Sequence, residues 1–226
     1  MNSLLVINAS ARTARSITRH LTSRFVEAWR LRNPNGEIID RDLGVHPAPP
    51  INHDWIASAF SDPGEHTPGM REALAMSEAL IEEIFRASAI VVGAPMYNFG
   101  MPAQLKAYVD QIIRVGRTFA FNDPESANPY QGLVPSRPVV IVTSKGAGGY
   151  EPGGSYVHQN FLEPHLETVF QLIGLSDISF VSVAFEEMKD GRFQRSMKDA
   201  ESAIDRLAAR VGSETANLTA GMASVS

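Results

Sequence analysis

Short apolar runs alternate along the chain with segments whose apolar residues recur every three or four positions. The short runs predict strands, which we place at residues 4–7, 37–40, 89–93, 139–142 and 178–183. The periodic segments predict helices, which we place at residues 17–29, 68–85, 105–113, 162–173 and 197–211. Parallel strands need crossover connections, so this alternation predicts a doubly wound α/β fold with a five-stranded parallel sheet and helices on both faces.

Three loops with unusual residues follow strands of this sheet, at residues 10–18, 95–99 and 144–149. The carboxyl ends of parallel strands share one edge, so we expect the loops to converge there, where open α/β sheets bind their ligands. In the flavodoxin-like strand order, 2-1-3-4-5, these loops follow strands one, three and four. That switch point is where flavin mononucleotide (FMN) binds.

The first loop is rich in hydroxyl groups, including those of Ser10, Ser16 and Thr18, and it leads into a helix. The free N–H groups and the positive dipole end at the start of a helix favour an anion, so this loop predicts a phosphate site. Arg12 and Arg15 could add positive charge. A simpler interpretation is that Ser16 only caps the helix, and the two roles are compatible because they use the same N–H groups.

The second loop holds more special residues than a connection needs. Pro95 restricts Ala94 to extended geometry, and Gly100 permits unusual backbone angles. Tyr97 and Phe99 are large aromatic residues at the edge where a ligand is expected. The alternative is an ordinary connection whose aromatic residues pack against their neighbours.

The third loop is rich in glycine, which lets backbone N–H groups approach a ligand closely, although a flexible turn has the same composition. Two longer stretches, at residues 43–67 and 116–137, are expected to be irregular and carry several aromatic residues. Long loops of this kind are usually functional, so we expect them to wall a site or to contact a partner subunit. Local packing is the alternative.

Composition narrows the class of protein. The chain has 226 residues, 44% of them hydrophobic, which suits one domain over residues 1–211. Residues 212–226 are small, polar and aperiodic, and we expect them to form a disordered tail. The net charge of -5 gives no basic field for nucleic acid or for an anionic membrane. Since no apolar run is long enough to span a membrane and no signal peptide is present, we expect a cytoplasmic protein.

Several other chemistries lack the residues that they need. The sequence contains no cysteine, which excludes disulfides, thiolate metal sites and cysteine nucleophiles. Its six histidines are scattered without metal-ligand spacing, so we expect no metal site. No serine lies in a Gly-x-Ser-x-Gly elbow. Glu186 and Glu187 are more simply an exposed loop pair than a catalytic dyad.

The sequence resembles the FMN-dependent NADH azoreductase (NADH:quinone oxidoreductase) family over nearly its whole length, to about Val211. The resemblance rests on three motifs, which are Pro95-Met96-Tyr97-Asn98-Phe99, Ser10…Ser16-Ile17-Thr18 and Thr143-Ser144-Lys145-Gly146. Agreement is weaker at residues 41–43 and 203–205. The resemblance implies a flavodoxin-like homodimer that moves a hydride from NADH or NADPH to FMN. Two electrons would then pass to a quinone or an azo compound in a ping-pong cycle.

The resemblance also implies which residues hold the cofactor. The FMN phosphate would be held by Ser10, Ser16, Ile17 and Thr18. The isoalloxazine ring would be lined by Met96, Tyr97, Asn98 and Phe99, and its pyrimidine side would meet Ser144, Lys145, Gly146 and Ala147. We expect Asn98 to fix the ring through its amide. The flavin carries the chemistry, so hydride transfer itself needs no acid, base or nucleophile from the protein.

Aromatic residues outside the three motifs are candidates for the substrate pocket. They are Phe60, Phe119, Phe121 and Phe161, the last a candidate from the partner subunit. Here the chain departs from the family, which can have an arginine near Phe60 and a tyrosine at Phe121, and residues 124–130 are extra length. Lys145-Gly146-Ala147 also stands where the family often has Arg-Gly. These departures affect the expected preference for an electron acceptor more than they affect the expected FMN site.

Two other functions are compatible with a flavodoxin-like fold. An electron carrier would pass single electrons to protein partners, and the two long aromatic stretches argue against it because a carrier favours a short chain with an acidic face. A flavin-binding or regulatory module without turnover is also compatible with the sequence. Consumption of NADH in the presence of a quinone distinguishes the enzyme from that module.

Overall fold

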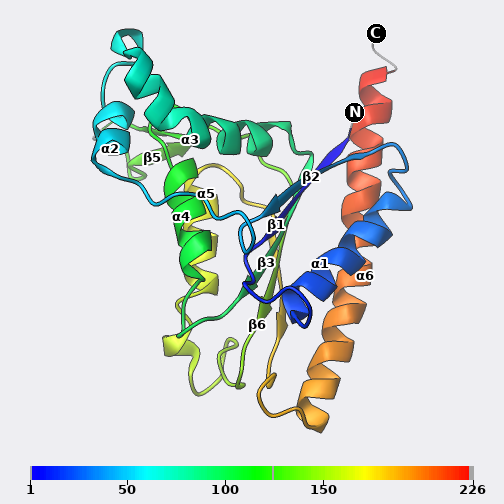
Figure 1. Cartoon of the computed structure of the whole chain (residues 1–226). Helices are drawn as coiled ribbons and strands as arrows, with labels where there is room; N and C mark the ends of the chain where they lie inside the picture. The colour runs from blue at the N-terminus through cyan, green and yellow to red at the C-terminus, as the bar shows by residue number, and fades with distance from the viewer. Residues whose placement is uncertain (1, 124, 224–226) are drawn as a thin grey trace.

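The computed structural model describes residues 2–123 and 125–223 and forms one five-stranded sheet (Figure 1). Its strands are β1 (Ser3–Asn8), β2 (Glu37–Asp42), β3 (Ala89–Pro95), β6 (Val139–Ser144) and β7 (Ile178–Val183). They lie in the order β2-β1-β3-β6-β7, and every neighbouring pair is parallel. Counted along this sheet, the order is 2-1-3-4-5, so the predicted doubly wound fold is confirmed.

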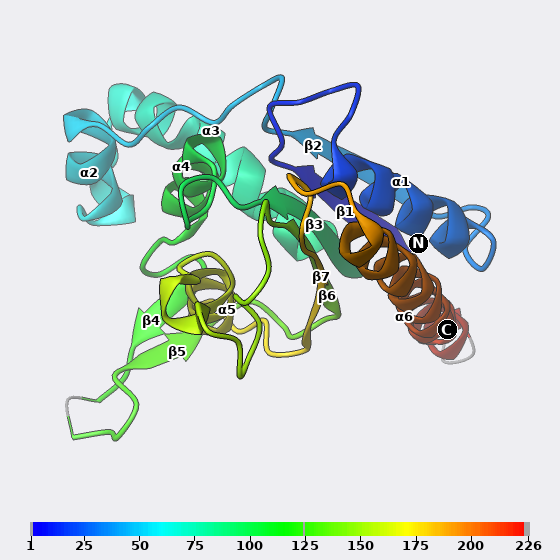
Figure 2. The ribbon, with the colours of Figure 1, turned by 90° about the horizontal axis from the view of Figure 1, so that it is seen from below.

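Helices cover both faces of the sheet (Figure 2). One face packs against α1 (Ile17–Arg30) and α6 (Gly191–Ala223), and the other packs against α3 (Pro68–Arg86), α4 (Ala103–Ile112) and α5 (Glu163–Leu172). Alternate residues of a strand point to opposite faces, so Leu4 and Val6 belong to the first core while Leu5 and Ile7 belong to the second. Burial on both faces explains the continuously apolar runs of the sequence.

The two stretches that we expected to be irregular contain regular structure. Residues 43–67 include α2 (His53–Ala59), which the side chain of Asn52 caps by accepting a hydrogen bond from Trp55 N at 2.9 Å, and a 3-10 turn at Pro63–Glu65. Residues 116–137 include an antiparallel hairpin of β4 (Phe119–Phe121) and β5 (Tyr130–Gly132). The expectation was wrong because seven-residue and three-residue elements are too short to leave a clear periodic signal.

The expected disordered tail is also wrong for the residues that the structure describes. The helix α6 continues through residues 212–223, and residues 224–226 lie outside the described part of the chain. Thr215 is fully buried against α1, where Trp29 Nε1 donates a hydrogen bond to its hydroxyl at 3.2 Å. Asn33 Nδ2 donates to the carbonyl of Gly212 at 3.0 Å. These contacts with α1 and with the turn after it stabilise a segment whose own composition gives no helical pattern.

The register of the sheet brings the strand ends to one edge. Asn8 is paired with Gly93, and Ser144 is paired with both Pro95 and Val183, so the segments after β1, β3, β6 and β7 start side by side. At Gly93 an added Cβ would lie 3.0 Å from Asn8 Oδ1 and 3.1 Å from Thr22 Cγ2, which shows how closely α1 packs there. Within the described residues, no helix is both long enough and apolar enough to cross a membrane.

Candidate functional site

A hollow lies at the carboxyl edge of the sheet, and all three predicted loops line it. Seven of the predicted cofactor residues surround it, namely Ser10, Ser16, Ile17, Met96, Tyr97, Ser144 and Gly146. Pro95 also lines it, as do Arg12, Glu186 and Glu187. The predicted convergence of the loops therefore occurs within a single chain.

The first loop ends at the start of α1, where backbone donors are available. Ser16 is the N-cap, and its hydroxyl accepts a hydrogen bond from Arg19 N at 3.3 Å. The N–H groups of Ile17 and Thr18 have no acceptor among the described residues, as expected for the first turn of a helix. The Ser16 and Thr18 hydroxyls lie 3.2 Å apart. Capping and anion binding can thus coexist here, because the cap uses only the Arg19 amide.

A residue that the sequence reasoning missed fixes this loop. The Arg19 guanidinium donates two hydrogen bonds of 2.6 Å to the carboxylate of Asp42 and two, of 2.8 and 3.2 Å, to the carbonyl of Ser10. Hydrogen bonding from Arg19 holds the pKa of Asp42 below its usual range. Asp42 lies at the end of β2, so this bidentate pair ties the first loop to the edge of the sheet. The only signal in the sequence was the weak family agreement at residues 41–43.

The second loop forms a tight turn. Tyr97 and Gly100 exchange backbone hydrogen bonds of 2.9 and 3.0 Å, and the two residues between them have positive φ, 48° at Asn98 and 69° at Phe99. We expected unusual angles at Gly100, and the structure places them on the two preceding residues instead. A left-handed conformation costs a non-glycine residue about 1–2 kcal/mol. Strain of this kind is typical of ligand-binding segments, and the N–H groups of Asn98 and Phe99 have no acceptor in the described chain.

The third loop presents its backbone rather than its charge. The Lys145 side chain is 3% exposed and turns inward, where its ammonium lies 2.6 Å from a carboxylate oxygen of Glu163 at the start of α5. Its own N–H donates to Val183 O. The N–H groups of Gly146 and Ala147 have no acceptor within the described residues. The groups that this loop offers to a ligand therefore include those amides and the Ser144 hydroxyl.

A fourth loop, residues 184–190 after β7, completes the site and was missed. Phe185, Glu186 and Glu187 donate their N–H groups to the carbonyls of Ala147, Lys145 and Gly146. Phe185 and Lys189 have positive φ, so the backbone of this loop is strained at both ends. Glu186 is half-buried, and one of its carboxylate oxygens lies 3.0 Å from a guanidinium nitrogen of Arg12. The prediction that Glu186 is simply an exposed loop residue was therefore wrong. The position of this loop directly after the fifth strand was a usable signal.

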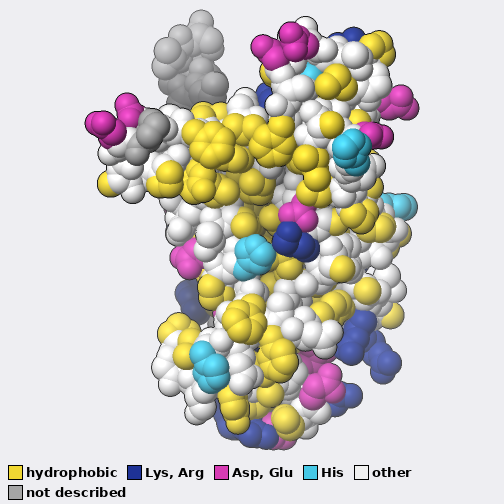
Figure 3. Space-filling model, turned by 90° about the vertical axis from the view of Figure 1, so that its left-hand side faces the viewer, with side chains coloured by type: hydrophobic (Ala, Val, Ile, Leu, Met, Phe, Trp, Pro, Cys, Tyr) yellow, Lys and Arg dark blue, Asp and Glu magenta, His cyan; other side chains and the backbone are white. Residues whose placement is uncertain are grey.

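The predicted substrate-pocket residues fall into two groups. Phe161 lies beside the second loop, where its N–H donates to Phe99 O at 3.0 Å. Phe60 and Phe119 line a separate apolar hollow of about 340 Å³ between α2 and the end of α4, and Phe121 packs on Phe119 with ring centroids 5.7 Å apart. Figure 3 shows hydrophobic side chains gathered on this face of the molecule. A single chain therefore does not bring the four phenylalanines together.

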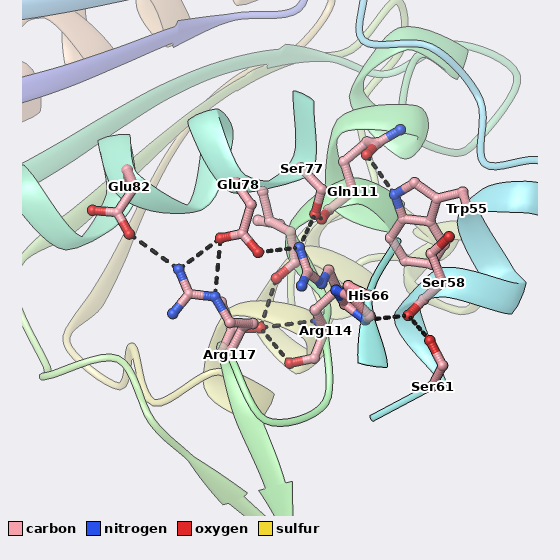
Figure 4. A network of polar contacts seen from close by, with 12 residues as sticks. Trp55, Ser58, Ser61, His66, Ser77, Glu78, Glu82, Gln111, Arg114 and Arg117 are labelled. Carbon is pink, nitrogen blue, oxygen red and sulfur yellow. Dashed lines mark hydrogen bonds and ion pairs between the residues drawn. The ribbon is translucent and has the colours of Figure 1, made fainter. Parts of the chain in front are cut away.

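Charged residues support the wall of that apolar hollow (Figure 4). Arg114 is 6% exposed and lies 2.8 Å from Glu78, which also pairs with Arg117 at 2.7 Å. Burial raises the pKa of Glu78, but its hydrogen bonds and ion pairs with the two arginines outweigh burial and hold it below the usual value. Trp55 Nε1 donates to Gln111 Oε1 at 2.8 Å, which anchors α2 on α4. No group of three or more potential metal ligands occurs in the described residues.

These features define a doubly wound α/β protein of the flavodoxin-like class, with unpaired backbone N–H groups at the start of α1. The flavodoxin-like fold family matches residues 2–210. The chain is 44% identical over 211 residues to the FMN-dependent NADH:quinone oxidoreductase of Opitutus terrae, a match that covers 93% of this chain and 99% of that protein. It is 41% identical over 205 residues to FMN-dependent NADH:quinone oxidoreductase 2 of Trichormus variabilis, covering 90% and 97%. The chain belongs to this family of FMN-dependent NADH:quinone oxidoreductases.

Solved structures agree with the fold. An FMN-dependent NADH-azoreductase from Bacillus anthracis, crystallised with FMN, superposes with a TM-score of 0.77 at 24% identity, covering 92% of this chain and 100% of that one. Another Bacillus anthracis azoreductase gives a TM-score of 0.82 at 20% identity, covering 92% and 99%. At these identities the likeness establishes the shared fold.

Proposed function

We propose that this chain is an FMN-dependent oxidoreductase that takes a hydride from NADH, or from NADPH, and delivers two electrons to a quinone or an azo compound. The observation that carries the proposal is the convergence of three loops that offer unpaired N–H groups at one edge of a flavodoxin-like sheet. The relatives of 41–44% identity, which are FMN-dependent NADH:quinone oxidoreductases, support it. When bound, FMN supplies the hydride and electron chemistry.

Separate groups of the described residues suit the phosphate, the pyrimidine edge and the ring of FMN. The Ile17 and Thr18 amides, with the hydroxyls of Ser10 and Ser16, would hold the phosphate, because free N–H groups and the helix dipole both favour an anion. The Gly146 and Ala147 amides would meet the pyrimidine edge of the ring, where negative charge grows on reduction. Met96 and Tyr97, with Ser144, would line the ring, and the inward-turned Lys145 would hold the third loop in place.

The turn at Asn98 and Phe99 would position the ring itself. Both residues are exposed and adopt positive φ, so the turn projects from the sheet edge with its amides free. The Asn98 amide can donate and accept at once, which matches a flavin edge that carries both kinds of group. Phe99 lies 6.4 Å from the Tyr150 ring and is hydrogen-bonded to Phe161. This aromatic group would exclude water from one side of the site.

A second copy of the chain would complete the substrate pocket. Phe60 and Phe121 are 73% and 62% exposed, and they lie away from the carboxyl edge of their own sheet. Exposed apolar patches of this kind mark protein interfaces. In the homodimer that we propose, the face that carries Phe60, Phe119 and Phe121 meets the partner subunit and walls its site.

An anaerobic titration of the FMN-loaded protein with NADH, followed by flavin absorbance, tests the proposal. Rapid bleaching, with colour restored by menadione or an azo dye, is the expected result. Tight FMN binding without bleaching by NADH or NADPH would instead favour an electron carrier or a non-catalytic flavin-binding module. A protein that does not retain FMN would overturn the assignment of the three loops.

A further inference from the structure

A second hollow, of about 380 Å³, adjoins the proposed phosphate site. It lies between the first loop, the fourth loop and the start of α6, and its charged and aromatic lining consists of Arg12, Arg15, Glu186, Glu187, Lys189 and Phe193. Arg12, Glu186 and Glu187 line the proposed FMN hollow as well. The two hollows are therefore neighbours that share a wall at the phosphate end of the FMN site. Its volume lies within the range of small-molecule sites.

Two of the three cations that line this second hollow lack an ion-pair partner among the described residues. Arg15 and Lys189 have no ion-pair partner among the residues that the structure describes, although two carboxylates line the same hollow. Arg12 is paired with Glu186 at 3.0 Å, and its side chain is 60% exposed. Arginine is the side chain best suited to bind phosphate, because its planar fork presents two donors. The hollow thus offers unused positive charge beside a site that already favours a phosphate.

The remaining lining residues suit the other parts of a nucleotide. Carboxylates such as those of Glu186 and Glu187 accept hydrogen bonds from ribose hydroxyl groups in dinucleotide-binding proteins. Phe193 is half-buried at the start of α6, with part of its ring packed on the core beneath the hollow. An aromatic ring held in this way offers a flat apolar surface to a base. The hollow therefore offers cations for a phosphate, carboxylates for a ribose and an aromatic ring for a base.

We infer that this hollow binds the adenylate end of a dinucleotide. The inference depends on the proposed placement of the FMN phosphate at the start of α1. Two ligands carry that group. In flavin adenine dinucleotide (FAD) the adenylate is joined to the FMN phosphate itself, so it would pass from one hollow into the next beside Arg12. In NADH it would bind while the nicotinamide end reaches the flavin.

The test compares FMN, FAD and NADH on the wild-type chain and on two variants, Arg15→Gln and Phe193→Ala. Neither residue lines the FMN hollow, so the positive charge that the sequence offered at Arg15 lies outside the proposed phosphate site. Arg30→Gln is the matched control, because Arg30 is an exposed arginine at the opposite end of α1. Dissociation constants of FMN and FAD are measured by flavin fluorescence on the apoprotein. Those of NADH and of reduced nicotinamide mononucleotide, which lacks the adenylate, come from rapid reduction of the FMN-loaded protein.

Two results would support the inference and would identify the source of the adenylate. If FAD is the source, it binds the wild-type protein within tenfold of FMN, and each variant weakens FAD at least fivefold while FMN stays within twofold. If NADH is the source, each variant weakens NADH at least fivefold and leaves reduced nicotinamide mononucleotide unchanged. The control variant behaves as wild type in both cases.

The inference is overturned if both variants bind FMN, FAD and NADH as the wild-type protein does, or if they weaken FMN as much as FAD. Failure of the wild-type protein to bind FMN is a different result. It would remove the proposed function and this inference together. Circular dichroism of each variant verifies that the fold is unchanged.

Discussion

The ammonium of Lys145 lies 2.6 Å from the carboxylate of Glu163, directly behind the loop that presents the Gly146 and Ala147 amides. The carboxylate of Glu163 also accepts hydrogen bonds of 2.6 Å from Thr143 Oγ1 and from Asn160 Nδ2. The carboxylate thus joins the end of β6, the third loop and the start of α5. The family resemblance implied that Lys145 meets the pyrimidine side of the flavin; the structure turns its charge toward Glu163, where it fixes the backbone that would contact the ring.

Replacing Glu163 by Gln should destabilise the protein and weaken FMN binding. Removing one partner of a buried ion pair leaves an uncompensated charge and costs about 3–5 kcal/mol. Urea denaturation measures the stability, and fluorescence titration measures the FMN affinity. The double variant Lys145→Met with Glu163→Gln should recover most of the loss, because it removes the charge and keeps an acceptor for Thr143. If the single variant is as stable as wild type, the pair is not structural.

The same carboxylate gives a pH dependence with a defined sign. Burial raises the pKa of Glu163, but the Lys145 charge and the hydrogen bonds from Lys145, Thr143 and Asn160 outweigh burial and lower it below its usual value. The unfolded chain therefore takes up the proton first as the pH falls, and the stabilisation present above about pH 4.3 is lost on passing through the folded pKa. The stability difference between wild type and Glu163→Gln should shrink between pH 6 and pH 3.5. A constant difference in urea denaturation across this range would contradict the assignment.

Two substitutions at Asn98 should separate its amide from its backbone. Asn98→Gly keeps the positive φ without strain and removes only the side chain, whereas Asn98→Ala also places an alanine in the left-handed region. Both variants should bind FMN more weakly and accept hydride from NADH more slowly. Asn98→Ala should also be about 1 kcal/mol less stable than Asn98→Gly. Stopped-flow reduction and urea denaturation measure these quantities, and unchanged FMN affinity in Asn98→Gly would remove the role of the amide.

The exposed face around Phe60 should control dimer formation. Buried aromatic residues at interfaces contribute 2 kcal/mol or more when truncated, so Phe60→Ala should weaken the dimer about thirtyfold or more. Leu31→Ala is the matched control, because Leu31 is 82% exposed at the end of α1 and far from this face. Sedimentation velocity over a range of concentrations measures the dissociation constant. A wild-type protein that stays monomeric would overturn the proposed dimer.

The fold could be predicted because its signals are local and strong. The runs at residues 89–93 and 139–142 are apolar throughout, as strands buried on two faces must be. The loop positions followed from the topology, because carboxyl ends of parallel strands share an edge. The same reasoning applies to the fourth loop, since Glu186 lies three residues after the end of the fifth strand. The sequence contained that signal, and the carboxylate pair was interpreted too simply.

Other features depend on contacts between distant segments and left no local signal. Nothing in Ser144-Lys145-Gly146 indicates that the lysine points inward, because its partner lies 18 residues further along at the start of α5. The strain at Asn98 and Phe99 was assigned to Gly100, since glycine is the usual residue for positive φ. The continuation of α6 depends on a buried hydrogen bond between Trp29 and Thr215, which are 186 residues apart.

That hydrogen bond makes the last part of α6 testable as a structural element. Thr215→Val keeps the shape of the side chain but leaves the buried Trp29 N–H without its acceptor, which should cost about 1–3 kcal/mol in urea denaturation. Thr215→Ser is the matched control, because it keeps the hydroxyl and loses only a methyl group. Adding Trp29→Phe to Thr215→Val should make the two losses less than additive, since the unpaired donor is then gone. Equal stability of Thr215→Val and wild type would mean that the hydrogen bond between Trp29 and Thr215 does not stabilise the end of α6.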